Sequence, residues 1–368
     1  PLADTKGKKV FVRGYSLLEP GSGLVYRSYE EALYVLFNKN EPNKAELLAF
    51  EQKIKAALST DLKLEKSLLC IPSLEEKPLI LLQMLLLSLS YENDKDHINI
   101  VTYAFVVVAH LFNKYMGRKP VSPNPNLNLI ENLLYMIGKD YKNPLLLKNF
   151  TQMMIAWMDM GLAPSAIATR INTCSRADVI SALVAGLANM TGEKHTSARI
   201  KSMRLLIDIQ NTVQAQKLSI IDDKTKIKNI IQEKLQAILD KDEIVSGFGH
   251  YIFKGLDDNG IDPRICLVEQ GIQSLYPQDI MLPIINIMRE IFSSGLLTYH
   301  HKPLILPPNS DIYWSGFLNN FFSDYQAKNI DAMASLFNIL TRISGLLAHD
   351  EEQRQRKDTV KIWGWITE

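Results

Sequence analysis

The segment Ser246-Gly247-Phe248-Gly249-His250 combines residue types that can do chemistry. Glycines allow backbone N–H groups to approach a ligand closely, as recognition of a phosphate or a carbonyl requires. The histidine that follows can donate a hydrogen bond or transfer a proton near neutral pH. Because Gly-x-Gly turns are common, this segment alone indicates little, and its weight depends on the rest of the chain.

Charged residues of complementary chemistry lie elsewhere in the chain. Asp262-Pro263-Arg264 and Pro308-Asn309-Ser310-Asp311 follow the glycine segment, Arg342 lies in a helical pattern, and His195 precedes them all. A carboxylate can remove a weakly acidic proton, and histidines can donate to a developing enolate or to a ketone oxygen. Two arginines can bind carboxylates in a forked geometry that lysine cannot copy.

Helical periodicity dominates the stretches that must position these residues. Between Asn43 and Leu58, apolar residues repeat at i, i+3 and i+4 steps behind the helix-start pair Asn43 and Glu46, and Ser28 with Glu31 forms a similar capping box. Further helices are predicted over residues 127–138, 145–160, 178–190, 197–214, 224–240, 277–292 and 330–348. No alternating run between hairpin turns competes with them, so the sequence predicts an all-α fold, with loops at 247–262 and 302–310.

A change in pattern divides the chain. Residues 196–240 are more charged than what precedes them, and the proline-rich stretch 303–308 is the expected return to the main core. At 368 residues, about two domains are expected. We therefore predict a large helical domain of residues 1–195 and 309–368, and a smaller helical domain of residues 196–308.

Composition excludes several classes of partner. With 41 Lys and Arg against 40 Asp and Glu, the net charge is +1, so no global field favours nucleic acid or an anionic membrane. The longest apolar runs, 79–89 and 101–112, fall short of the roughly 20 residues of a membrane span and are predicted to be buried helices. Three widely spaced cysteines argue against a disulfide framework or a structural zinc site, so we expect no metal and a reducing, cytoplasmic setting.

Several motifs occur together in the order found in the citrate synthase family. Gly-Phe-Gly-His and Asp-Pro-Arg stand at 247–250 and 262–264, Pro-Asn-x-Asp at 308–311, and a helix of the family as Phe337, Arg342, Gly345, Ala348 and His349. Three further segments are similar to those of the family: the opening at 13–32, the proline turn and following helix at 123–135, and the helix that leads from 181 to His195. The chain therefore resembles this family over nearly its whole length.

The resemblance implies a citrate synthase-like two-domain helical fold with a mobile smaller lobe, a homodimer, and an acyltransferase that condenses acetyl- or propionyl-CoA with oxaloacetate. By resemblance, Asp311 would be the general base, His195 would hydrogen-bond the thioester oxygen, and His250 would polarise the 2-oxo group. Arg264 and Arg342 would bind the oxo acid. The path of CoA would be lined by Gly247, Phe248, Gly249 and Lys254. The CoA thioester is then a substrate, and no tightly bound cofactor is expected.

The chain departs from the family pattern at several positions. Met160, within Asp159-Met160-Gly161, stands where the family has a histidine, and a thioether cannot donate a hydrogen bond. Around His195 the glycines of Gly-Pro-x-His-Gly-Gly are replaced by Thr196 and Ser197. Residues 255–260 are an insertion, Trp314 is an extra residue, and the tail at 358–363 lacks the arginine of relatives, for which Arg354 or Arg356 are the candidate substitutes.

Singly, each candidate has an ordinary structural interpretation. Asp311 could be a helix N-cap, Arg342 a salt-bridged helix residue and His250 a surface histidine. His110, in an apolar run, and His97, in a polar loop, keep such interpretations. The ordered set favours a site, and three functions stay open: synthesis of citrate or an alkylcitrate, cleavage of a citryl-CoA-like thioester, and a non-catalytic homologue that acts as a binding subunit.

Overall fold

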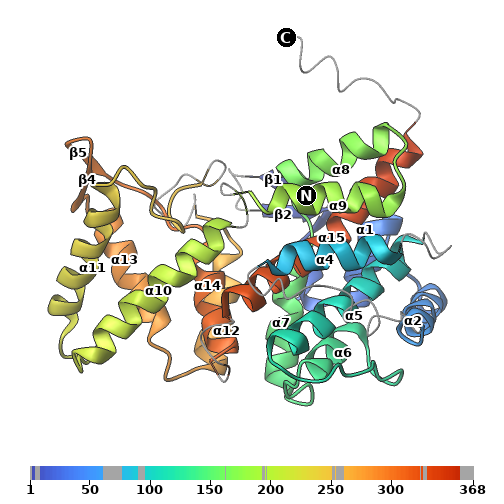
Figure 1. The fold of residues 1–368 in the computed structure, drawn as a ribbon, viewed down its shortest axis with the longest axis horizontal. Helices are drawn as coiled ribbons and strands as arrows, with labels where there is room; N and C mark the ends of the chain where they lie inside the picture. Colours follow the sequence, from blue (N-terminus) through green and yellow to red (C-terminus); the bar gives the residue numbers. More distant parts are fainter. Residues whose placement is uncertain are drawn as a thin grey trace, which may run out of the picture. The chain divides into compact units, whose positions relative to one another are not determined.

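The computed structural model describes residues 2–4, 9–60, 77–89, 96–161, 163–192, 195, 197–250, 253, 261–323, 325 and 330–356. Almost all regular structure in these ranges is helical, so the predicted all-α fold is confirmed. The chain packs as two compact units (Figure 1): unit 1 comprises residues 1–2, 11–196 and 331–368, and unit 2 comprises residues 3–10 and 197–330.

Unit 1 contains a 3-10 turn and nine helices among the described residues. They are η1 (Leu24–Tyr26), α1 (Tyr29–Asn38), α2 (Lys44–Leu58), α4 (Pro78–Ser88), α5 (His97–Tyr115), α6 (Leu129–Met136), α7 (Pro144–Ala156), α8 (Pro164–Cys174), α9 (Val179–Met190) and α15 (Ile330–Gln355). The two predicted capping boxes are present, at Ser28 and Glu31 before α1 and at Asn43 and Glu46 before α2. Such caps satisfy amide groups that the first helical turn leaves unpaired.

Helix α15 runs through the core of unit 1. Phe337 on α15 meets Phe112 of α5 and Phe150 of α7 edge to face, with ring centroids 6.1 and 6.0 Å apart. Among the described helices, α15 alone is long and apolar enough to span a membrane by length and composition, but 94% of its apolar window is buried inside the structure. A buried core helix passes the same test, so this is weak support for a membrane span.

Unit 2 contains α10 (Ser197–Ala215), α11 (Lys224–Leu239), α12 (Ile265–Leu275), α13 (Met281–Ser293) and α14 (Ser310–Phe321). Its core includes Trp314, which is fully buried and stacks on Phe317 with ring centroids 5.6 Å apart. The predicted domains assign residues 309–330 to the large domain. In the structure α14 packs on α10, α12 and α13, and unit 2 continues to residue 330.

Short strands occur where the sequence predicted none. Strands β1 (Leu2–Asp4), β2 (Lys9–Val12) and β3 (Tyr15–Ser16) form a small sheet near the N-terminus, and β4 (Leu297–Tyr299) pairs antiparallel with β5 (Lys302–Leu304). The β4–β5 turn holds His300 and His301 at φ angles of 48° and 62°. The predicted loop at 302–310 therefore begins with a strand, because three residues are too few for an alternating pattern to be recognised.

Candidate functional site

Three predicted site motifs meet within unit 2, and the backbone holds two of them together. The amide of Gly249 donates to the carbonyl of Pro307 at 2.7 Å, and the amide of Asn309 donates to the carbonyl of Gly247 at 2.9 Å. The side chain of Asn309 adds a bond from Nδ2 to the carbonyl of Gly249, 2.9 Å long. The glycine segment is thereby fixed against the residues that begin α14.

Two glycine positions in this segment require glycine. Gly247 and Gly249 have φ angles of +99° and +77°, which side chains rarely adopt. A Cβ atom on Gly247 would lie 2.7 Å from Cβ of Ile312 on α14. Phe248 between them is buried and stacks on Phe292, with ring centroids 4.1 Å apart. The segment therefore packs tightly on α14 at Ile312, the residue that follows Asp311, the predicted base.

Asp311 lies in the first turn of α14. Asn309 caps this helix, since its Oδ1 accepts a hydrogen bond from the amide of Asp311 at 2.9 Å. Asn309, and not Asp311, therefore serves as the N-cap, which leaves the carboxylate of Asp311 available for other contacts. The side chain of Asp311 is 26% exposed.

His250 lies near charged groups and is largely shielded from water. Its Nδ1 accepts a hydrogen bond from the amide of Phe253 at 3.1 Å, which leaves Nε2 as the protonated, donating nitrogen of a neutral ring. Burial lowers the pKa of His250, and the charges of Asp262, Arg264 and Asp311 also act on it, the two carboxylates in the opposite direction. A neutral ring with its proton on Nε2 is the form that could polarise a ketone oxygen.

Arg264 is engaged within the protein. Its guanidinium donates to the Asp262 carboxylate through Nη2 at 2.7 Å and Nε at 3.0 Å, and both side chains are almost fully buried, at 4% and 0% exposure. Although burial alone would raise the pKa of Asp262, the neighbouring Arg264 holds it below its usual range. Arg264 thus neutralises a buried carboxylate beside His250, and its predicted role with the oxo acid stays a prediction.

A residue absent from the sequence predictions contacts Asp311. Arg199 on α10 donates from Nε to Oδ1 of Asp311 at 2.5 Å. Nothing in the sequence pointed to it, because Arg199 lies in a charged amphipathic helix where arginines are common, and 112 residues separate the two partners.

The other predicted residues belong to unit 1. His195 is half-buried, with Nε2 3.1 Å from Oγ of Ser165 at the start of α8. Arg342 is buried on α15, 7% exposed. The structure therefore brings His250, Arg264 and Asp311 together in unit 2, while the convergence of His195 and Arg342 with them stays a prediction.

Near Met160, unit 1 carries a chain of hydrogen bonds. Nε2 of His349 on α15 donates to Oδ1 of Asp159 at 3.0 Å, and Nδ1 of the same ring accepts from Arg170 Nη2 at 2.7 Å. Since arginine can only donate, His349 is fixed as the tautomer with its proton on Nε2. Asp159, the residue before Met160, is therefore held by α15.

Some predicted positions cannot be placed. Lys254, the insertion at 255–260, Thr196 and the tail at 358–363 lie outside the described residues. Arg354 and Arg356 are described, and both form ion pairs with α15: Arg354 with Asp350 at 2.7 Å, and Arg356, just after the helix, with Glu352 at 3.3 Å. Within the described part of the chain, no group of three or more His, Cys, Asp or Glu side chains is arranged to hold a metal ion.

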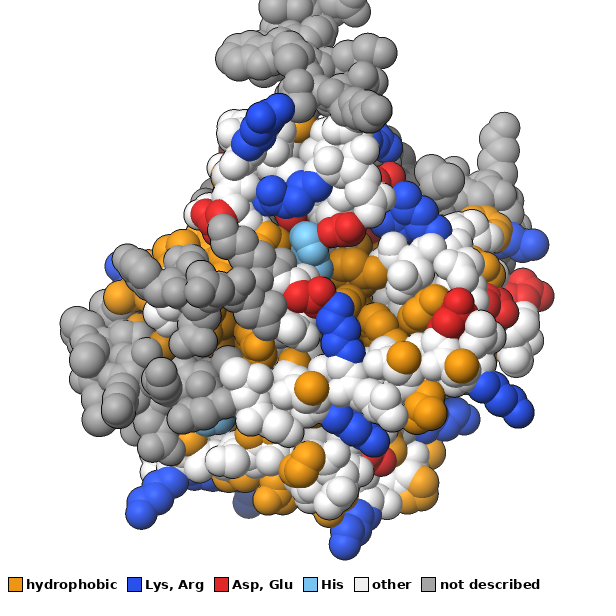
Figure 2. Space-filling view, turned by 90° about the vertical axis from the view of Figure 1, so that its right-hand side faces the viewer, with side chains coloured by type: hydrophobic (Ala, Val, Ile, Leu, Met, Phe, Trp, Pro, Cys, Tyr) orange, Lys and Arg blue, Asp and Glu red, His pale blue; other side chains and the backbone are white. Residues whose placement is uncertain are grey.

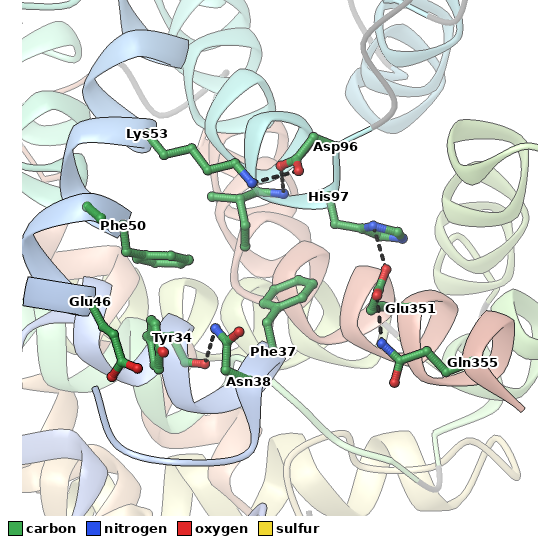
Figure 3. A pocket seen from close by; sticks show the side chains of 12 residues that line it. Tyr34, Phe37, Asn38, Glu46, Phe50, Lys53, Asp96, His97, Glu351 and Gln355 are labelled. Atoms are coloured by element: carbon green, nitrogen blue, oxygen red, sulfur yellow. Dashed lines mark hydrogen bonds and ion pairs between the residues drawn. The ribbon is translucent and has the colours of Figure 1, made fainter. Parts of the chain in front are cut away.

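A cavity of about 470 Å³ opens in unit 1 among α1, α2, α5 and α15, apart from every predicted site residue (Figure 3). His97 lines it, with Nε2 2.8 Å from Asp350 and Nδ1 2.9 Å from Glu351. His97 was predicted to lie in a loop. In the structure it is the first residue of α5, because Asp96 caps this helix. Figure 2, a view onto the right-hand side of Figure 1, shows a histidine with acidic and basic side chains around it.

The fold and these motifs agree with comparisons to known proteins. The family model described as "Citrate synthase, C-terminal domain" matches residues 2–363. The solved citrate synthase of Thermotoga maritima superposes with a TM-score of 0.74 at 20% identity, covering 95% of this chain and 87% of that one. A ternary complex of the Thermoplasma acidophilum citrate synthase with carboxymethyl coenzyme A and oxaloacetate superposes with a TM-score of 0.76 at 16% identity, covering 97% and 89%. The chain belongs to the citrate synthase family.

Relatives within the family carry different names. Citrate synthase of Haloferax volcanii is 26% identical over 64% of this chain and 61% of that protein, and the peroxisomal citrate synthase 1 of Arabidopsis thaliana is 26% identical over 72% and 50%. A 2-methylcitrate synthase of Mycobacterium tuberculosis is 23% identical over 93% and 80%. The match thus spans about half to two thirds of the first two relatives, and the family name alone does not select a substrate.

Proposed function

We propose that the protein is an acyltransferase that condenses acetyl-CoA or propionyl-CoA with oxaloacetate, yielding citrate or an alkylcitrate and free CoA. The observation that supports this most is the pair of backbone hydrogen bonds that fixes the glycine segment before His250 against the residues before Asp311. They place a neutral imidazole and a carboxylate on one rigid support, as acid–base chemistry at a carbonyl requires.

The proposed reaction has three stages. The Asp311 carboxylate removes a proton from the carbon next to the thioester carbonyl, and the electron pair of that C–H bond forms the enolate, whose oxygen accepts a hydrogen bond from His195. The enolate carbon then forms a bond to the ketone carbon, while His250 transfers its Nε2 proton to the ketone oxygen, which becomes a hydroxyl. The proton held by Asp311 restores the proton of His250 before the next turnover. Water finally cleaves the thioester, which gives the carboxylate product, the CoA thiol and a proton.

The remaining residues have binding roles in this proposal. Arg342 and Arg264, the latter beside His250, bind the carboxylates of the oxo acid. The path of CoA is lined by Gly247, Phe248, Gly249 and Lys254. No tightly bound cofactor takes part, since the thioester is a substrate. We further propose a homodimer in the cytoplasm.

A non-catalytic homologue is the second candidate. It is favoured by Met160, which cannot donate a hydrogen bond, and by the ion pair that Asp311 already forms with Arg199. Cleavage of a citryl-CoA-like thioester would use the same aspartate and histidines in reverse.

Release of free thiol from acetyl-CoA or propionyl-CoA with oxaloacetate tests the proposal. We expect Asp311→Asn to lower kcat by at least about 100-fold, the usual weight of a general base. Asp331→Asn, an acidic residue in the first turn of α15, serves as the matched control and should keep wild-type rates. Formation of acetyl-CoA and oxaloacetate from citryl-CoA, without release of free thiol, would favour the lyase. CoA binding without turnover of either substrate would favour the non-catalytic homologue.

A further inference from the structure

Arg199 and Asp311 form a close, largely shielded ion pair within unit 2. Nε of Arg199 donates to Oδ1 of Asp311 at 2.5 Å, and the arginine side chain is only 11% exposed. Charge-assisted hydrogen bonds of this kind are shorter and stronger than neutral ones. The carboxylate is therefore held by one oxygen.

Both partners are fixed through their backbones as well. Oγ of Ser315, one helical turn after Asp311 on α14, donates to the carbonyl of Arg199 at 2.9 Å. The amide of Asp311 is fixed by the Asn309 cap. Because Ser315 is buried, the carbonyl of Arg199 is anchored away from water. The backbone of Arg199 on α10 is thus fixed in position, and its guanidinium reaches Asp311 from there.

The second carboxylate oxygen has no such partner. Within the described part of the chain, the bond from Arg199 is the only hydrogen bond to the carboxylate of Asp311. Arg264, the other arginine near His250, is committed to Asp262. Oδ2 is therefore the oxygen of Asp311 that can accept a proton from a substrate.

We propose that Arg199 is a positioning residue for the condensation: it holds Oδ1 of Asp311 and so presents Oδ2 to the acidic carbon of the acyl-CoA. This inference rests on the proposed function, in which Asp311 is the base. The proton moves from the carbon to Oδ2, the C–H electron pair enters the enolate, and Arg199 keeps its own protons throughout.

A purely structural role is the alternative to exclude. In that case the ion pair would only pin α10 to α14, and its removal would reduce the amount of folded enzyme without changing how a folded molecule removes the proton. The kinetic isotope effect separates the two, because it reports the proton-removal step and not the active fraction.

The experiment uses the full chain, with acetyl-CoA carrying a protiated or trideuterated methyl group, and oxaloacetate. Arg199→Met removes the donor at similar volume, and Arg199→Lys retains the charge. Arg204→Met is the matched control, since Arg204 is exposed on the same helix.

We expect Arg199→Met to lower kcat by about 100-fold, as for a misplaced catalytic group, with KM values within about 3-fold. The isotope effect on kcat/KM should rise, and Arg199→Lys should recover part of kcat.

Each outcome decides the matter. Wild-type kcat and isotope effect in Arg199→Met, or a higher kcat, would overturn the proposal. A lower kcat with an unchanged isotope effect and a lower melting temperature would assign a structural role instead. If Arg199→Met does not fold, a raised isotope effect in folded Arg199→Lys supports the proposal and an unchanged one contradicts it. If wild type and Arg204→Met are both inactive, the proposed function itself fails, and this role of Arg199 falls with it.

Discussion

At the scale of single residues, His349 shows how helix α15 holds the segment around Met160. Its ring bridges Arg170 and Asp159. Burial alone would raise the pKa of Asp159, but the hydrogen bond from His349 helps hold that pKa below its usual range. Asp159 thus stays a charged acceptor, and the backbone that carries Met160 is fixed on α15.

Gly345 is the residue that permits this close approach. A Cβ atom at Gly345 would collide with the carbonyl oxygen of Met158 and lie 2.9 Å from Cα of Asp159, and neither backbone atom can yield cheaply. We expect Gly345→Ala to destabilise the fold by about 2 kcal/mol or more, because overpacking outweighs the gain in helix propensity. Urea unfolding measures this loss. Gly316→Ala on α14 is the control, because the nearest atom to its Cβ would be the flexible end of Ile285 at 3.0 Å, and its other neighbours lie at ordinary contact distance. Equal stability of the two variants would contradict the argument.

At the scale of elements, the last turns of α15 are bound to α8 and to the N-terminal segment by ion pairs. Glu352 accepts from Arg170 Nη2 at 2.5 Å and lies 3.5 Å from Arg13. Burial would raise the pKa of Glu352, but Arg170 and Arg13 lower it from 4.5 to about 2. The folded state therefore binds this proton less readily than the unfolded chain.

The sign of the pH effect follows from that difference. The stabilisation by Glu352 is fully present above about pH 4.5 and is lost as the pH falls towards 2. We expect Glu352→Gln to lower the free energy of unfolding at pH 7 by on the order of 2 to 3 kcal/mol, at about 1.4 kcal/mol per pKa unit. The difference from wild type should shrink between pH 5 and 3 in urea titrations. A difference that is constant with pH would contradict it, and Glu41→Gln, in an exposed pair with Arg27, should show little change.

The sequence predicted the bounds of three helices closely: those expected at 43–58, 178–190 and 224–240 correspond to α2, α9 and α11 within one residue at each end. In α2 and α9 a side-chain cap and an apolar period coincide, whereas α11 has the apolar period without a side-chain cap. Helix α13 begins at Met281 and not at Pro277, because Asp279 accepts from the amides of Met281 and Leu282. Contacts between distant helices could not be predicted, and Arg199 with Asp311 is the clearest case.

At the scale of the whole molecule, the predicted site residues are divided between the two units. The ordered motifs were enough to predict the family, because each motif is local in sequence. Within unit 2 the meeting of His250 and Asp311 depends on backbone bonds between residues 247–249 and 307–309, which no local pattern encodes. The run at 79–89, predicted to be buried, also leaves apolar side chains exposed, namely Ile80, Met84 and Leu87 on α4.

Exposed apolar residues on unit 1 argue for self-association. Ile167 and Ile171 lie one turn apart on α8 and are 48% and 44% exposed, a stripe that a second copy could cover in an isologous interface. We expect the wild type to sediment as a dimer at micromolar concentration and the double variant Ile167→Glu, Ile171→Glu as a monomer, because four carboxylates would be buried at the dyad without partners. The matched control is the double variant Ile221→Glu, Ile244→Glu in unit 2. These residues are 87% and 78% exposed but do not lie in one stripe, so this variant should remain dimeric. A monomeric wild type would refute the dimer, and a dimeric double variant would place the interface elsewhere.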